Sequence, residues 1–61
     1  EAGLTPRERE ILGYLGRGHG IAFVAATLVI SESTVRTHVK SIYKKLGVNG
    51  REELLAKVDE G

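Results

Sequence analysis

Residues 31–46, SESTVRTHVKSIYKKL, predict one long amphipathic helix. Ser31 is a typical N-cap residue, because its hydroxyl accepts hydrogen bonds from free backbone N–H groups of a first helical turn. Glu32 adds a negative charge at the positive end of the helix dipole. Apolar residues recur at helical spacing and form one stripe that can face a core: Val35, Val39, Ile42, Tyr43 and Leu46.

The opposite face of this helix carries long cations and short hydroxyl side chains. Its members are Arg36, Thr37, Lys40 and Lys44, with Ser33 and Ser41 beside them. Such a face suits the phosphates and base edges of a nucleic acid. A merely solvated face is the usual explanation for a charged stripe, and the residue pattern alone leaves both interpretations open.

The positive charge of the chain is concentrated on this helix. The net charge of all 61 residues is only +1. Residues 31–46 hold four cations against one acid, whereas the remainder holds five cations against seven acids. The local field is therefore more informative than the total charge.

Residues 4–8, LTPRE, predict the start of an earlier helix. Thr5 suits the N-cap, Pro6 suits the first helical position, and Glu8 completes a capping box with Thr5. Gly16 and Gly18 are expected to end this helix, which should span about residues 5–17.

The run IAFVAATLVI, residues 21–30, is ambiguous by pattern because its β-branched residues favour a strand. A lone strand between helices would have no pairing partner. We therefore expect a helix over residues 21–28 and a tight turn through Val29 and Ile30.

Gly47 is expected to stop the long helix in the left-handed conformation. Asn49 then suits a cap, and Leu54, Leu55 and Val58 give a short helix one apolar face. The predicted fold is all-α, a compact four-helix bundle containing a helix-turn-helix, with helices at about 5–17, 21–28, 31–46 and 51–59.

Length and composition predict a single small domain over residues 1–61. The sequence contains no cysteine, which excludes a disulfide framework and favours a cytoplasmic protein. The longest apolar run is too short to span a hydrocarbon layer of roughly 30 Å.

Three blocks of the sequence closely resemble the LuxR-type (LuxR/NarL/FixJ) helix-turn-helix domain. They are Leu-Thr-Pro-Arg-Glu-Arg-Glu-Ile-Leu at 4–12, Ile-Ser-Glu-Ser-Thr-Val-Arg-Thr-His-Val-Lys at 30–40 and Lys-Lys-Leu-Gly-Val at 44–48. The resemblance implies that the third helix enters the major groove of an operator in double-stranded DNA and that the fourth helix commonly pairs two copies. It also implies a C-terminal output module of a longer transcription regulator, preceded by a sensor or receiver.

The resemblance assigns roles to individual positions. It implies base contacts by Arg36, Thr37 and Lys40. It implies phosphate contacts by Ser31, Ser33 and Thr34, with His38 and Lys44 as further candidates. A homodimer would pair through Leu54, Leu55 and Val58.

Two features depart from the family pattern. Uncharged residues occupy second-helix positions that usually carry charge: Ala22, Phe23, Ala26 and Thr27. Gly50 stands where the family usually has a Ser or Thr cap. The alternative is a protein-interaction module that binds a partner polypeptide through its apolar second and fourth helices.

Enzymatic chemistry is not expected. His19 and His38 are not accompanied by cysteine, so the sequence predicts no metal site and no acid–base pair. No serine lies in a nucleophile-elbow setting, and no cofactor is expected.

Overall fold

The computed structural model describes residues 3–60, with side-chain surroundings described for residues 3–57. Four helices follow one another: α1 (Pro6–Gly16), α2 (Ile21–Leu28), α3 (Glu32–Leu46) and α4 (Arg51–Glu60). No strand occurs in residues 3–60. The predicted all-α class and the helical assignment of the apolar run are confirmed, and the boundaries differ by at most one residue.

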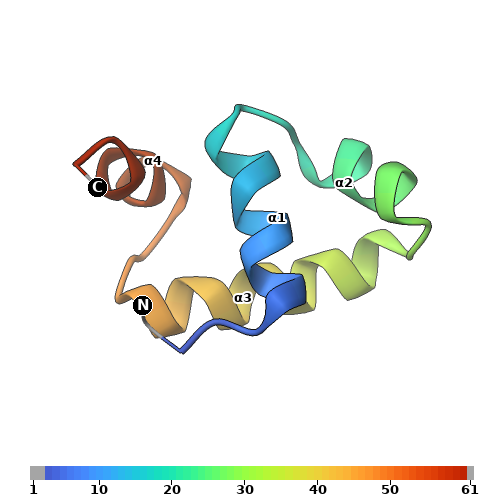
Figure 1. Ribbon diagram of the computed structural model, residues 1–61, viewed down its shortest axis with the longest axis horizontal. Coiled ribbons are helices and arrows are strands. Elements are labelled where there is room, and N and C mark those ends of the chain that lie inside the picture. The colour runs from blue at the N-terminus through green and yellow to red at the C-terminus, as the bar shows by residue number, and fades with distance from the viewer. Residues whose placement is uncertain (1–2, 61) are drawn as a thin grey trace.

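α3 runs along most of the molecule, and α1 and α2 pack against it (Figure 1). α1 lies across α3, and α2 and α4 sit on opposite sides of α1. α3 packs against both α1 and α2, whereas α4 packs against α1. The core therefore collects apolar side chains from every helix: Ile11, Leu15, Val24, Ala25, Val35, Val39, Ile42 and Leu54, together with Val48 from the segment between α3 and α4.

Side-chain caps begin α1 and α3 as predicted. The Glu8 N–H donates to the Thr5 hydroxyl oxygen at 3.1 Å, and the Thr5 N–H donates to Glu8 Oε1 at 2.9 Å. The Thr34 N–H donates to the Ser31 hydroxyl oxygen at 3.1 Å. Because a cap of this kind is worth about 1 kcal/mol, both matter in a domain of this size.

Val29 makes the turn between α2 and α3 in the left-handed conformation, with φ 58° and ψ 48°. It is the one non-glycine residue with a positive φ in the part of the chain described. This conformation is strained for a β-branched residue. The Ile30 N–H donates to the Ala25 carbonyl at 3.0 Å, which closes the turn and holds α2 close to the start of α3.

The α3–α4 connection differs in detail from the expected cap. Gly47 is left-handed at φ 71°, as predicted, and the Val48 N–H donates to the Tyr43 carbonyl at 3.0 Å. The Asn49 N–H donates to Glu53 Oε1 at 2.7 Å. The acid that closes the start of α4 is therefore Glu53, which accepts from the Asn49 backbone, and the helix begins at Arg51 as predicted.

Arg51 joins the start of α4 to the end of α1. Its Nη2 atom donates to the His19 carbonyl at 2.7 Å and to the Leu15 carbonyl at 3.3 Å. The Leu15 carbonyl lies in the last turn of α1 and also accepts from the Gly18 N–H, whereas the His19 carbonyl lies in the loop after the helix. The Arg51 cation gives both carbonyl groups a further partner. Nothing in the local pattern around Arg51 predicts this contact.

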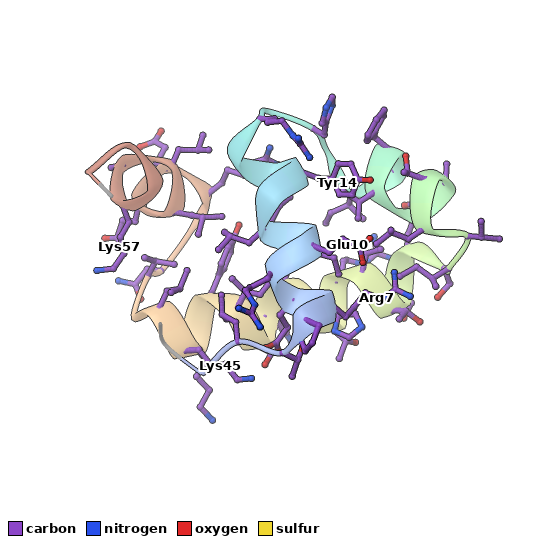
Figure 2. The ribbon with its side chains drawn as sticks, in the orientation of Figure 1. Arg7, Glu10, Tyr14, Lys45 and Lys57 are labelled. Carbon is purple, nitrogen blue, oxygen red and sulfur yellow. The ribbon has the colours of Figure 1, made fainter. Side chains whose placement is uncertain are left out.

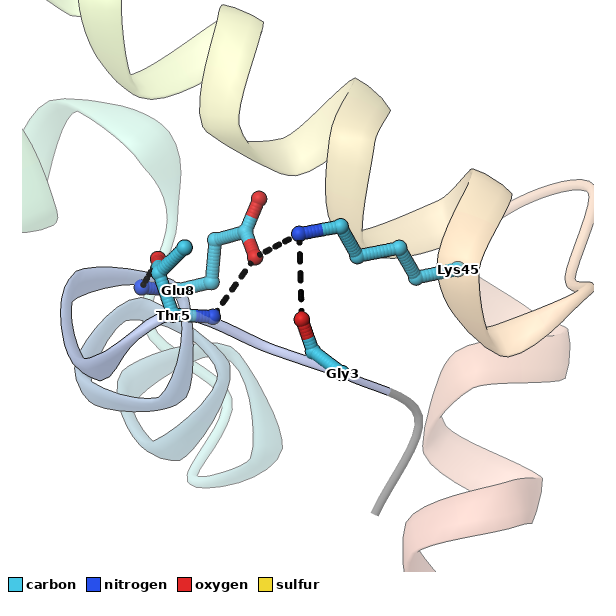
Figure 3. Close-up of polar contacts among 4 residues, drawn as sticks. All are labelled: Gly3, Thr5, Glu8 and Lys45. Carbon is cyan, nitrogen blue, oxygen red and sulfur yellow. Dashed lines mark hydrogen bonds and ion pairs between the residues drawn. The ribbon is translucent and has the colours of Figure 1, made fainter.

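A buried carboxylate connects the start of α1 to the end of α3 (Figure 3). Glu8 is only 4% exposed, and its Oε1 atom lies 2.7 Å from Lys45 Nζ. Lys45 Nζ also donates to the Gly3 carbonyl at 3.2 Å. The hydrogen bond from Lys45, with those from Ser41 and the Thr5 backbone, lowers the pKa of Glu8 from 4.5 to about 2.

The stability of the domain is expected to fall as the pH drops from about 4.5 to about 2. Above that range Glu8 is ionised in both the folded and the unfolded chain, so its contribution to stability is complete. As the pH falls through the folded-state pKa, Glu8 is protonated in both states and the contribution is lost. Thermal unfolding followed by circular dichroism from neutral pH downward measures this profile.

The variant Glu8→Gln should flatten this acid limb, because an amide has no charge to lose. Glu10→Gln is the matched control, since Glu10 is exposed and pairs with Arg7 at 3.4 Å on the same helix. This control keeps the contact between Glu8 and Lys45 and should keep the limb. Parallel profiles for Glu8→Gln and the parent chain would contradict the assignment.

Candidate nucleic-acid interface

The rotation of α3 about its axis is set by its buried stripe. Val35, Val39 and Ile42 are all buried in the core. The opposite face is therefore turned outward, and all its predicted base-facing and cationic residues are exposed: Ser33, Arg36, Thr37, Lys40 and Lys44. The sequence pattern correctly separated the two faces of this helix.

This outward face is hollowed by a shallow depression. Ser33, Arg36, Thr37, Val39 and Lys40 line it. Val39 supplies an apolar surface, whereas the other residues supply a hydroxyl, a methyl group and two cations. The structure thus brings the three residues predicted to face bases into one concave surface, together with one residue predicted to contact phosphate.

Arg36 lies beside an acid of its own helix. Its Nη1 atom is 3.6 Å from Glu32 Oε1, and the two side chains are 59% and 54% exposed. A pair four residues apart in this order is favourable on a helix, though small in energy when exposed. The guanidinium is consequently held near the first turn of α3 without being buried.

Thr37 presents its methyl group rather than its hydroxyl hydrogen. Its Oγ1 atom donates to the Ser33 carbonyl at 3.1 Å, one turn earlier in the helix. A hydroxyl group has a single hydrogen to donate, so this bond uses it. The methyl group of Thr37 is left as the apolar part of an exposed side chain.

The two hydroxyl groups at the start of α3 are joined to each other. The Ser31 hydroxyl donates to Thr34 Oγ1 at 2.9 Å and accepts from the Thr34 N–H. The hydrogen of Ser31 is thus occupied, whereas Thr34 retains its own hydroxyl hydrogen for a ligand. Ser31 orients Thr34 and caps the helix, and Thr34 is the better placed donor.

The remaining residues predicted to contact phosphate differ in their exposure to solvent. Lys44 is exposed in the last turn of α3, whereas His38 is half-buried. Lys45, the fourth cation of this helix, is turned toward Glu8 and Gly3. The outward field of α3 therefore comes from Arg36, Lys40 and Lys44.

α2 contributes an aromatic cluster but no charge. The Phe23 ring stacks on the His19 ring with centroids 3.9 Å apart, and its edge meets Tyr14 at 5.9 Å. Tyr14 projects from α1 toward α2 (Figure 2), and the Arg17 guanidinium lies 5.2 Å from its ring centroid. Phe23 is 45% exposed, because His19 and Tyr14 cover part of its surface. The exposed apolar surface of α2 is therefore smaller than its composition suggests.

The residues predicted to pair two copies lie in different places. Leu54 is fully buried in the core of the single chain, so its side chain is not on the surface. Leu55 is half-buried, and the side chain of Val58 lies outside the described part of the structure. A second shallow depression borders α4, lined by Gly47, Val48, Glu53, Ala56 and Lys57.

Two kinds of feature are absent from the described part of the chain, a metal-binding cluster and a membrane-spanning helix. Residues 3–57 contain no group of three His, Cys, Asp or Glu side chains that would hold a metal ion. Among the described helices, none is both long enough and apolar enough to cross a membrane. The exposed surface of α3 is the most distinctive feature for binding.

Comparisons with known proteins match this chain to bacterial transcription regulators. The family model described as "Bacterial regulatory proteins, luxR family" matches residues 2–58. The chain is 45% identical over 53 residues to the "Probable transcriptional regulatory protein NarL" of Mycobacterium tuberculosis, covering 87% of this chain and 24% of that protein.

Two further relatives are also several times longer than this chain. The "Transcriptional regulatory protein MctR" of Rhizobium johnstonii is 49% identical over 45 residues, covering 74% of this chain and 21% of that protein. The "HTH-type transcriptional regulator MalT" of Serratia proteamaculans is 33% identical over 57 residues, covering 93% of this chain and 6% of that protein. The chain therefore spans a quarter or less of these relatives.

Proposed function

This chain belongs to the luxR family of bacterial regulatory proteins, and on that premise we propose that it binds a specific site in double-stranded DNA to regulate transcription. The reading element is α3, placed in the major groove with its outer face toward the base edges. The observation that carries the proposal is the depression formed by Ser33, Arg36, Thr37, Val39 and Lys40.

Three residues are proposed to read bases. Arg36 has a fork of N–H donors that suits the O6 and N7 acceptors of guanine. Lys40 lies one helical turn further along and can donate to a neighbouring base. The outward methyl group of Thr37 suits the C5-methyl group of thymine, because its hydroxyl is turned back to Ser33.

Other residues of α3 are proposed to hold the DNA backbone and so to set the register of the helix. Thr34 donates its free hydroxyl hydrogen to a phosphate, and Ser31 supports it through their mutual hydrogen bond. Ser33, His38 and Lys44 provide further phosphate contacts. The free N–H groups at the start of α3 add to the attraction for an anion.

We further propose that the domain acts as a homodimer on DNA. Two copies would place one α3 in each of two half-sites about 34 Å apart, or one helical turn. Among the described side chains of α4, the half-buried Leu55 and the depression lined by Ala56 and Lys57 are available for pairing. Within a longer cytoplasmic regulator, residues 1–61 would be the DNA-binding domain and another region would carry the sensor or receiver.

Selection of bound duplexes from a random pool is the direct test of sequence-specific binding. A recovered consensus with two related half-sites would support both the reading role of α3 and the dimer. Titration of that duplex should then saturate at two chains per site. Recovery of no consensus would overturn the proposed function.

Binding to the selected duplex should weaken steeply with added salt. Each chain exposes four α3 cations, of which Lys45 also pairs with Glu8, and neutralised phosphates release counterions when the complex forms. If a dimer neutralises about four phosphates, a plot of log association constant against log salt has a slope of about −3.6. Fluorescence anisotropy at several salt concentrations measures it, and a slope shallower than about −1 would contradict an interface built on phosphate contacts.

A further inference from the structure

We propose that Glu32 determines specificity by positioning Arg36 and by disfavouring DNA that lacks the base which Arg36 reads. This inference rests on the proposed function, because it assigns a role within the same DNA-reading surface. Glu32 is the one acid within residues 31–46, and its carboxylate stands at the start of the helix that carries the reading residues.

The geometry places this carboxylate directly against the reading side chain. Glu32 Oε1 lies 3.6 Å from Arg36 Nη1, and Arg36 also lines the depression on the outer face of α3. An arginine carries five N–H donors, so an ion pair with Glu32 leaves enough donors for both guanine acceptors. Holding the guanidinium near Glu32 also reduces the conformational entropy that the Arg36 side chain loses on binding.

The charge of Glu32 acts differently on operator and on other DNA. A carboxylate beside the phosphate backbone is repelled by any duplex, which weakens non-specific attraction. This repulsion by itself acts on operator and random duplex alike. The two differ because Arg36 contacts guanine at the operator while it stays beside Glu32, whereas on a random duplex its pairing with Glu32 competes with a contact between Arg36 and a phosphate. The acid therefore widens the ratio between specific and non-specific affinity.

Two substitutions separate positioning from charge. Glu32→Gln keeps an acceptor oxygen and removes the charge, so random-duplex affinity should rise about threefold while operator affinity changes less, which narrows the ratio between the two affinities. Glu32→Ala removes both, so the same rise should be joined by about a fivefold loss of preference for the base that Arg36 reads. Fluorescence anisotropy with the selected operator, single-base variants of it and a random duplex measures all three quantities.

Two controls make these measurements specific. Glu10→Ala removes the same charge from the exposed pair with Arg7 on α1, and it should leave base preference and random-duplex affinity unchanged. In an Arg36→Ala background, Glu32→Ala should no longer alter base preference but should still raise random-duplex affinity. Circular dichroism of each variant reports whether α3 stays helical.

The inference is overturned if Glu32→Ala changes operator and random-duplex affinity by the same factor, or changes neither. It is also overturned if the loss of base preference persists without Arg36. Failure of the proposed function would be seen earlier, in the parent chain itself. The unsubstituted chain would then bind no selected duplex more tightly than a random duplex.

Discussion

Replacing Ile42 by alanine is expected to lower the free energy of unfolding by about 2 to 5 kcal/mol. Ile42 is fully buried where α3 meets the rest of the core. The substitution removes three carbon atoms and leaves a cavity that the surrounding helices fill only in part. A single core in a domain this small rarely supplies more than about 3 to 5 kcal/mol, so much of the population should unfold.

Urea unfolding followed by circular dichroism measures this loss. Ile42→Val is the matched control, because it keeps the branched shape and should cost only about 0.5 to 1.5 kcal/mol. A loss below about 1 kcal/mol for the alanine variant would show that α3 is not anchored through Ile42. Burial of Ile42 would then not explain which face of α3 points outward.

The paired substitution Arg36→Ala and Lys40→Ala is expected to weaken operator binding by about 30-fold or more. Each base contact is worth about 1 to 3 kcal/mol of discrimination, and a factor of ten corresponds to about 1.4 kcal/mol. Both side chains are exposed, so the helix should remain folded. Fluorescence anisotropy with the selected duplex measures binding, and unchanged circular dichroism confirms the fold.

The matched control removes two exposed cations outside α3, Arg7 of α1 and Arg17 at the C-cap of that helix. It changes the net charge equally and should weaken operator binding far less, because neither residue lies on α3. If the Arg36 and Lys40 variant binds the operator as well as the control, the reading role is wrong. Survival of binding to a partner polypeptide in that variant would instead favour the protein-interaction alternative.

Much of this fold could be predicted because its signals are local. A capping box needs only Thr5 and Glu8, three residues apart, and the stop after α3 needs only Gly47. The buried stripe of α3 follows from 3.6-residue periodicity, so Val35, Val39 and Ile42 were assigned correctly. The outward face that holds Arg36, Thr37 and Lys40 follows from the same periodicity.

The contacts that could not be predicted join residues distant in the chain. Glu8 was expected to act only as a capping residue, but it also binds Lys45 from the far end of α3. Arg51 caps the end of α1, and Phe23 stacks on His19. No short pattern encodes these pairs, because each depends on how two elements approach each other in space.

Leu54 illustrates the limit for the candidate site. The pattern placed it with Leu55 and Val58 on one apolar face, which was assigned to pairing between two copies. Packing of α4 against α1 instead buries Leu54 in the core of one chain. Periodicity identifies an apolar face, but it does not state which neighbouring surface covers that face.

The sequence by itself determined the four helices, the side-chain caps of α1 and α3, the stop at Gly47 and the cationic face of α3, because each depends mainly on interactions within a few residues. Tertiary structure alone decided which of those charges remain available. It paired Lys45 with the buried Glu8 and left Arg36, Lys40 and Lys44 on the outer face of the helix. It also joined five residues in one depression: Ser33, Arg36, Thr37, Val39 and Lys40. The physical reason is that burial and ion pairing depend on the packing of whole helices, which fixes where each side chain can reach.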